Sequence, residues 1–189
     1  MLGFFSICGF ACLKTLVSQQ WSYAFFVRGF GCALFILGEK HMIIAFCGHA
    51  DYTPSNQDEQ RILDFLEQRI GDQPADFYLG GYGSFDHFAF RCGKKYQRLH
   101  PNAKMLFVTP YLTEDYQKKH LKELESDYDG IIYPPLERVP PKFAILLRNR
   151  WIAEQSDCVI AYVTRSYGGA YQMLQHAKRH QKEIWQLAP

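Results

Sequence analysis

The sequence lacks a surplus of charge of either sign. Its 189 residues include 21 Lys and Arg against 19 Asp and Glu, a formal net charge of +2. Proteins that bind nucleic acid through its phosphates usually carry a clear basic surplus, so nucleic acid is not an expected partner. Hydrophobic residues make up 48% and charged residues 21%, which excludes an intrinsically disordered chain. Internal repeats and low-complexity tracts are missing as well.

Closely spaced cysteines are also missing. The six cysteines stand at positions 8, 12, 32, 47, 92 and 158, and none belongs to a CxxC pair. This spacing fits neither a zinc site nor a dense disulfide framework. Cys47 and Cys158 fall in apolar runs typical of buried strands, where cysteine behaves as a small hydrophobic residue. The pattern predicts a reducing, cytoplasmic location.

Residues 1–41 form an apolar, aromatic extension unlike the rest of the chain. A signal peptide fits poorly, because no small-residue cleavage site precedes residue 42. A membrane-spanning helix over residues 15–38 would carry Arg28 near its middle, at a cost of about 2.5–3.5 kcal/mol. A third interpretation is a mis-assigned start, because codons for Gly38-Glu39-Lys40 can form a ribosome-binding site just before Met42. We favour this third hypothesis, and expect membrane association only if residues 1–41 belong to the native protein.

Strand and helix patterns alternate over residues 42–189. An apolar run without two-residue alternation at 42–47 predicts a strand covered on both faces, and further strands are predicted at 76–79, 104–109, 130–133, 157–163 and 183–187. Apolar stripes predict helices over 55–70, 84–99, 142–155 and 168–180, the first capped by Ser55. The polar stretch 110–129 predicts a short, solvated helix. The fold class is therefore α/β, a Rossmann-like three-layer sandwich with a mainly parallel sheet.

Two glycine-rich loops each stand between a predicted strand and a predicted helix. They are Gly80-Gly81-Tyr82-Gly83 and Gly168-Gly169. Glycine lets a phosphate approach backbone N–H groups closely, and the helix that follows directs its free N–H groups toward the anion. We predict that both loops hold the phosphate end of a small nucleotide-type ligand. The alternative that these glycines only form tight turns stays open.

A set of short segments recurs in one known superfamily. The segments are the Gly48-His49 turn, the loop from Gly80 to Asp86, Arg148-Asn149-Arg150-Trp151 with Ser156-Asp157, and Tyr162 through Gly168-Gly169-Ala170. Together they resemble the SLOG superfamily, and within it the bacterial YpsA-like group (DUF1273). The resemblance covers nearly all of residues 42–189 and none of 1–41. It implies a Rossmann-like domain that binds a nucleotide or a nucleotide-derived ligand.

The predicted ligand-binding residues come from four loops that follow predicted strands, among them Thr109-Pro110-Tyr111, from the carboxyl end of the 157–163 strand and from one helix. Asp86 either caps the helix or accepts a ribose hydroxyl, and Tyr162 either stacks on a base or packs in the core. Arg148 and Arg150 face different directions on a helix, so only one is expected to reach a phosphate. The full set is Gly48, His49, Gly80, Gly81, Gly83, Ser84, Asp86, Pro110, Arg148, Arg150, Tyr162, Gly168 and Gly169.

The enzyme interpretation depends on a departure from the superfamily pattern. LOG-type phosphoribohydrolases carry a catalytic glutamate after their glycine loop, whereas here Gln172 and Gln175 follow Gly168-Gly169. Neutral amides cannot stabilise an oxocarbenium-like centre, which leaves Asp86 or Glu154 as carboxylates. We therefore expect a sensor or regulatory module and assign no catalytic residue. A nucleoside 5′-monophosphate phosphoribohydrolase is the alternative, and DprA-like single-strand DNA binding is the second.

Metal ligands are less evident. His176 and His180 stand four residues apart on a predicted helix, a spacing that can chelate a metal, but the sequence identifies no third ligand. We predict neither a metal site nor a cofactor. The basic run at Lys118, Lys119, His120 and Lys122 is diluted by acidic neighbours and indicates a solvated face. A homo-oligomer stays open.

Overall fold

The computed structural model describes residues 12–17, 20–25, 41–113, 116 and 126–187. The chain forms two units that divide after Lys40. In the first unit, β1 (Cys12–Val17) and β2 (Gln20–Phe25) pair as antiparallel strands. These strands occupy part of the segment for which a membrane-spanning helix is one interpretation. No helix within the described residues is long and apolar enough to cross a membrane. The mis-assigned start stays a prediction.

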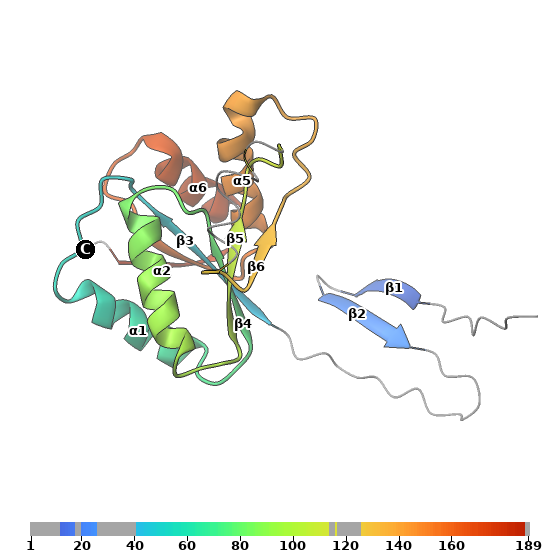
Figure 1. The fold of residues 1–189 in the computed structure, drawn as a ribbon, viewed down its shortest axis with the longest axis horizontal. Coiled ribbons are helices and arrows are strands. Elements are labelled where there is room, and N and C mark those ends of the chain that lie inside the picture. The colour runs from blue at the N-terminus through green and yellow to red at the C-terminus, as the bar shows by residue number, and fades with distance from the viewer. Residues whose placement is uncertain (1–11, 18–19, 26–40, 114–115, 117–125, 188–189) are drawn as a thin grey trace, which may run out of the picture. The chain divides into compact units, whose positions relative to one another are not determined.

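The second unit is built on a six-stranded sheet in which all paired strands are parallel (Figure 1). Its strands are β3 (Met42–Gly48), β4 (Ala75–Leu79), β5 (Ala103–Val108), β6 (Gly130–Ile132), β7 (Cys158–Tyr162) and β8 (Glu183–Gln186). Their order in space is β6-β5-β4-β3-β7-β8. The chain builds outward from β3 to β6 and then returns to add β7 on the other side of β3. In such sheets a crevice opens where the order reverses, here between β3 and β7.

Helices cover both faces of this sheet (Figure 1). Within the described residues they are α1 (Asp58–Arg69), α2 (Ser84–Gln97), α5 (Pro141–Gln155) and α6 (Gly168–Arg179). Alternate residues of β3 face opposite layers: Ile44 packs in a core with α1 and α2, and Ala45 in a second core with α5 and α6. This double burial explains the unbroken apolar run of the strand. The α/β, Rossmann-like three-layer prediction is confirmed.

The helix boundaries differ from the sequence prediction mainly at α1. The helix begins at Asp58, and its N-cap is Gln57, which makes no side-chain capping bond. The Asp58 carboxylate instead accepts hydrogen bonds from the Ser55 amide at 2.9 Å and the Tyr52 hydroxyl at 2.7 Å. The prediction that Ser55 caps the helix is therefore wrong, because its amide is held by a side chain within the first turn. The helix predicted in 110–129 and the basic run at 118–122 lie largely outside the described residues.

Candidate functional site

A pocket of about 340 Å³ lies at the point where the strand order reverses. The end of β3, the loop after β4, the middle of α5 and the segment joining β7 to α6 all contribute to its walls. Seven of the predicted residues line it: Gly48, His49, Gly80, Asp86, Arg148, Gly168 and Gly169. The other six lie outside it: Gly81, Gly83, Ser84, Pro110, Arg150 and Tyr162. The topology thus brings four separate chain segments together around one space.

The amino end of α6 opens on this pocket without a cap. Its N-cap residue, Tyr167, makes no side-chain capping bond, and the first turn holds no acidic residue. The first amides of a helix have no acceptor within the helix, and the residues at these positions, Gly168, Gly169 and Ala170, all line the pocket. Apart from its chain neighbours and the backbone of its own helix, no described atom lies within 4 Å of the point where a Gly168 side chain would begin. This end of α6 therefore presents free N–H groups and positive partial charge to open space.

A buried guanidinium adds a full positive charge to the same pocket. Arg148, on α5, is only 1% exposed. Its Nη1 donates to the Val108 carbonyl at 3.2 Å, and its Cζ lies 5.3 Å from the centre of the Tyr82 ring. Its Nε has no hydrogen-bond partner among the described residues. Burial lowers the pKa of Arg148, and the nearby Asp86 carboxylate opposes that shift. A buried cation therefore lines the pocket, and one of its donors has no partner among the described residues.

The loop after β4 departs from the expected phosphate-holding role. The Asp86 carboxylate accepts a hydrogen bond from the Tyr82 amide at 2.9 Å, and a second comes from the Gly81 amide. Gly80 serves packing, because a side chain there would overlap the guanidinium of Arg148. Two of the loop amides that could bind a phosphate, those of Gly81 and Tyr82, are thus engaged by the protein's own carboxylate. Of the two glycine loops predicted to bind phosphate, the one that precedes α6 remains the candidate.

Among the described residues that line the pocket, Asp86 is the one with a carboxyl side chain. Burial raises its pKa to about 6, and the bonds from the loop amides and the charge of Arg148 act in the opposite direction. The group therefore exchanges its proton close to neutral pH. Glu154, the other carboxylate considered from the sequence, lies outside the pocket and is hydrogen-bonded to His176.

His49 fixes the loop in front of α6. Its Nε2 accepts hydrogen bonds from the amides of Thr164, at 3.0 Å, and Arg165, at 3.2 Å. Burial and then the charge of Arg165 lower the pKa of His49, so the ring is neutral with its proton on Nδ1. Arg165 in turn forms two hydrogen bonds with Asp51, at 2.9 and 2.6 Å. These contacts fix the position of the loop relative to β3. Because Nε2 of His49 accepts both amide hydrogen bonds, it is not available to a phosphate.

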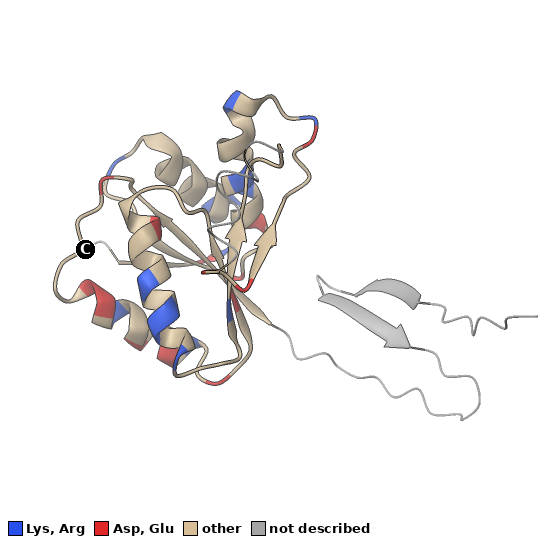
Figure 2. Ribbon diagram, in the orientation of Figure 1, with Lys and Arg blue, Asp and Glu red and all other residues tan. Residues whose placement is uncertain are grey.

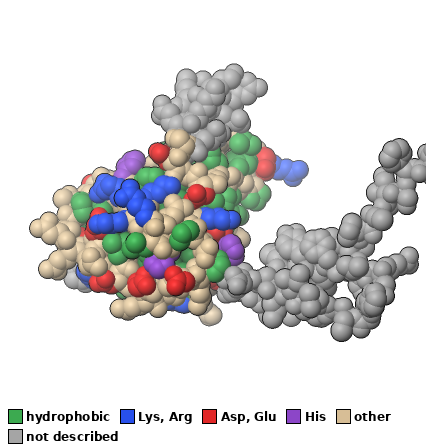
Figure 3. Space-filling model, turned by 60° about the horizontal axis from the view of Figure 1, so that its bottom comes forward, with side chains coloured by type: hydrophobic (Ala, Val, Ile, Leu, Met, Phe, Trp, Pro, Cys, Tyr) green, Lys and Arg blue, Asp and Glu red, His purple; other side chains and the backbone are tan. Residues whose placement is uncertain are grey.

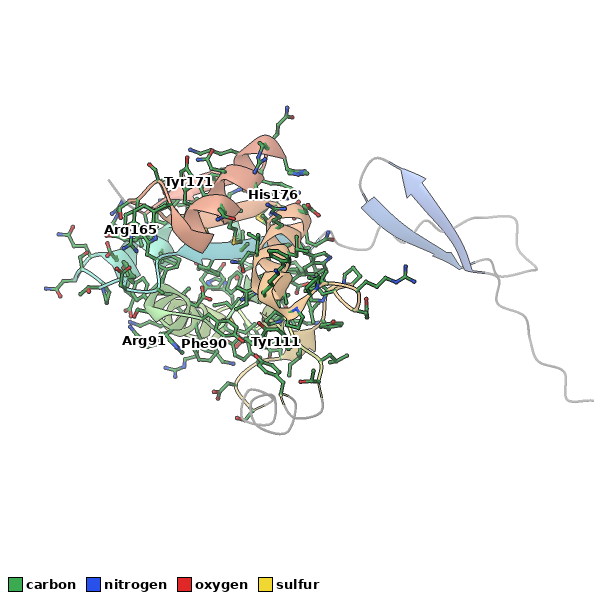
Figure 4. The ribbon with its side chains drawn as sticks, turned by 90° about the horizontal axis from the view of Figure 1, so that it is seen from above. Phe90, Arg91, Tyr111, Arg165, Tyr171 and His176 are labelled. Carbon is green, nitrogen blue, oxygen red and sulfur yellow. The ribbon has the colours of Figure 1, made fainter. Side chains whose placement is uncertain are left out.

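Two exposed tyrosines flank the pocket. Tyr82 is 41% exposed and Tyr167 is 67% exposed. The Arg165 guanidinium lies 5.5 Å from the centre of the Tyr167 ring, at the edge of the domain in Figure 4. Tyr162, expected to stack on a base or pack in the core, does the latter, since its ring lies 4.6 Å from that of Tyr52. The aromatic surface offered to a ligand therefore comes from Tyr82 and Tyr167.

Sequence reasoning missed several further residues of the pocket. Asn149 stands between the two arginines of the quoted motif, and Tyr82 lies inside the quoted glycine loop, so both had a signal by position. The remaining missed residues are Phe46, Cys47, Ala50, Ile145, Ile152, Arg165, Tyr167, Ala170 and Met173. Arg165, Tyr167 and Ala170 also lie inside a quoted segment. The apolar residues outside the quoted segments had no signal, because core and pocket positions of a helix or strand share the same pattern.

Comparison with solved structures relates this fold to a known protein. DNA processing protein A from Helicobacter pylori, studied for its single-stranded DNA binding mode, is 18% identical and superimposes with a TM-score of 0.52. The match covers 77% of this chain and 64% of that one. The two chains share a fold. The molybdenum cofactor carrier protein from Chlamydomonas reinhardtii is 14% identical over 78% of this chain and 76% of its own, with a TM-score of 0.45.

Comparison with models of protein families gave no match, and a search of curated proteins gave none either. The likeness to DNA processing protein A is therefore one of Rossmann-like architecture. It is the geometry of the pocket that supports an interpretation of function.

Proposed function

We propose that this pocket binds a nucleotide or a nucleotide-derived ligand, such as an ADP-ribose-like molecule or a nucleoside phosphate, with its phosphate end at α6. One observation carries the proposal. The uncapped amino end of α6 and the buried Arg148, whose Nε is unpartnered among the described residues, line the same pocket. The amino end of a helix is a ready-made anion site, and the arginine guanidinium matches the geometry of a phosphate group.

The rest of the pocket suits the remainder of such a ligand. Its volume, about 340 Å³, falls within the range of small-molecule sites. Apolar side chains of Ile145, Ile152 and Met173 provide a surface for a base or sugar, and Tyr82 and Tyr167 provide ring faces for stacking. In the absence of an assigned catalytic residue, a sensor or regulatory module is the role that this arrangement supports best.

Membership of the SLOG superfamily is part of what we propose. Each of the four segments that resemble the SLOG superfamily contributes residues to the pocket: Gly48-His49, Gly80 with Asp86, Arg148-Asn149, and Gly168-Gly169-Ala170. Their convergence supports membership of that superfamily and of its YpsA-like group.

Calorimetric titration of the full chain with ADP-ribose, NAD and AMP tests the proposal, using two substitutions at Gly169. A side chain at this position meets only an ordinary contact with Asn149, at 3.8 Å. Gly169→Asp puts a carboxylate where the phosphate is expected, and a negative charge at a helix amino end also favours folding. We expect affinity to fall about tenfold or more in Gly169→Asp and only a few-fold in the neutral Gly169→Asn. Absence of wild-type binding to all three compounds at millimolar concentration would contradict the proposal.

A specific observation also favours a second candidate, hydrolysis of a nucleoside 5′-monophosphate. Asp86 lines the pocket and its pKa is raised to about 6, in the range where a carboxyl group can deliver or accept a proton. The measurement is release of free base from AMP. If this candidate is correct, Asp86→Asn abolishes release while leaving ligand binding in place.

Single-stranded DNA binding gains no such support. One basic residue of α2, Lys95, forms an ion pair with Glu59 at 2.5 Å. Figure 2 shows both charges on the neighbouring helices α1 and α2. In the surface view of Figure 3, the cluster of Lys and Arg is bordered by Asp and Glu. A continuous basic groove, which DNA binding of this kind requires, is not visible on that face.

A further inference from the structure

Three potential metal ligands meet where α5 and α6 pack together, outside the pocket. His176 lies in the last turn of α6 and His180 is the C-cap residue that follows it, with ring centres 4.4 Å apart. Glu154 stands near the end of α5, and its Oε1 is 2.7 Å from Nε2 of His176. One ligand atom from each of the three residues lies within 4.8 Å of the others. Figure 4 shows His176 on the side of α6 that faces α5.

The donor set is one that transition metals prefer. Two imidazole nitrogens and one carboxylate oxygen bind Zn²⁺ in many proteins, and histidines four residues apart on a helix are a recurring way to supply the first two. Bonds of about 2.0–2.2 Å to a tetrahedral ion put ligand atoms about 3.4 Å apart. Glu154 and His180 are exposed, so their side chains have room to rotate and close the present separation.

A structural role explains only two of the three side chains. The hydrogen bond from His176 to Glu154 ties α5 to α6 without any ion. His180 takes no part in that bond, and its ring contacts His176 without a hydrogen-bond partner among the described residues. The neighbouring Lys182 ammonium donates to the Glu154 backbone carbonyl at 2.6 Å, so it does not occupy the carboxylate.

We propose that Glu154, His176 and His180 bind a divalent transition-metal ion of the Zn²⁺ type. Glu154 is the third ligand that the sequence alone does not identify. Three protein ligands leave one coordination position of a tetrahedral ion open to solvent. The ion links α5 and α6, two helices that also line the pocket, so it stabilises their packing. The proposal is independent of the ligand assigned to the pocket.

The test uses the full chain, freed of metal with a chelator and then titrated with Zn²⁺ in competition with a chromophoric chelator. We expect one Zn²⁺ per chain in the wild type, and at least about tenfold weaker binding in His176→Ala, His180→Ala and Glu154→Gln. His87→Ala, which removes an exposed histidine on α2, is the matched control and should bind as the wild type does. Co²⁺ should give intense visible absorption typical of a four-coordinate ion in the wild type and the control.

Stability measurements complete the test, because His180 is exposed and its removal should leave the fold intact. Zn²⁺ should raise the melting temperature of the wild type and not that of His180→Ala. Binding by other groups of the chain, including the cysteines in residues 1–40, would persist in a His176→Ala/His180→Ala double variant. Equal Zn²⁺ affinity in the wild type and in that double variant would overturn the proposal, as would the lack of any binding at micromolar Zn²⁺.

Discussion

The chemistry of the pocket depends on two charged side chains, the buried Arg148 and the half-buried Asp86. They oppose each other in charge, and each shifts the pKa of the other toward the charged form while burial acts against both. For Asp86 burial prevails, and its pKa rises from an ordinary value of 3.8 to about 6. Because the folded state binds this proton more tightly, ionisation of Asp86 costs stability as the pH rises from about 4 to about 6.

This shift predicts a pH dependence of ligand affinity at the residue scale. ADP-ribose is a suitable probe because its pyrophosphate loses no proton near neutral pH. Lowering the pH through about 6 protonates Asp86 and removes a negative charge from the pocket in which we propose that the phosphates bind. We expect calorimetry to show affinity for ADP-ribose rising about three- to tenfold from about pH 7.5 to about pH 5.5. In Asp86→Asn the profile should be flatter; an identical slope in both proteins would show that another group titrates.

Among the elements, the pairing of β3 with the segment that leads into α6 is what positions the free helix end. His49, just after β3, accepts hydrogen bonds from the amides of Thr164 and Arg165, which follow β7. Asp51 and Arg165 add a second, exposed link between the same two segments. The contacts at β3 therefore determine where α6 begins, although 115 residues separate His49 from Thr164.

Removal of the His49 side chain is expected to destabilise the domain. His49→Ala leaves two amides without their acceptor, which costs about 1–3 kcal/mol of the free energy of unfolding, measurable by urea denaturation. The pKa of His49 is lowered from 6.5, so the unfolded chain binds its proton first and wild-type stability falls as the pH drops below about 6.5. His49→Ala should lack this component. His87→Ala serves as control, and equal stability of His49→Ala and the wild type at pH 7 would contradict the role given to His49.

For the whole molecule, the two-sided core lies within one unit. Both hydrophobic clusters are composed of residues from the unit that begins at His41, and the sheet that separates them is complete there. His41 itself contacts Asp76, with Nδ1 and Oδ1 3.5 Å apart. A domain of this size can bury enough apolar surface to fold alone.

This predicts that a chain of residues 41–189 folds independently. Its melting temperature should match that of the full chain within about two degrees, and calorimetry should give a single cooperative transition. Its affinities for ADP-ribose and for Zn²⁺ should also match, because both proposed sites lie within these residues. A fragment that melts much earlier, or that fails to fold, would show that residues 1–40 stabilise the domain.

Most of the fold follows from local patterns that the sequence displays directly. The unbroken apolar run at β3 requires cover on both faces, and Gly71, at φ +56°, ends the turn after α1 in a conformation that favours glycine. The start of α1 did not follow, because Asp58 was free to bond either its own helix or the preceding turn. The local sequence is compatible with both arrangements. Packing of Tyr52 against Phe85 and Phe88 favours the bonds to the preceding turn, because the Tyr52 hydroxyl then donates to the Asp58 carboxylate.

The sequence by itself determined the order of strands and helices, the parallel sheet and the loops on which the pocket depends. Tertiary structure alone decided that Asp86 fills one glycine loop, that α6 stays uncapped, and that Glu154 meets His176 across 22 residues. The physical reason is the range over which each kind of interaction acts. Helix and strand preferences act between near neighbours in the chain, whereas a binding site depends on distances in space that exist only after α5 and α6 have packed on the sheet.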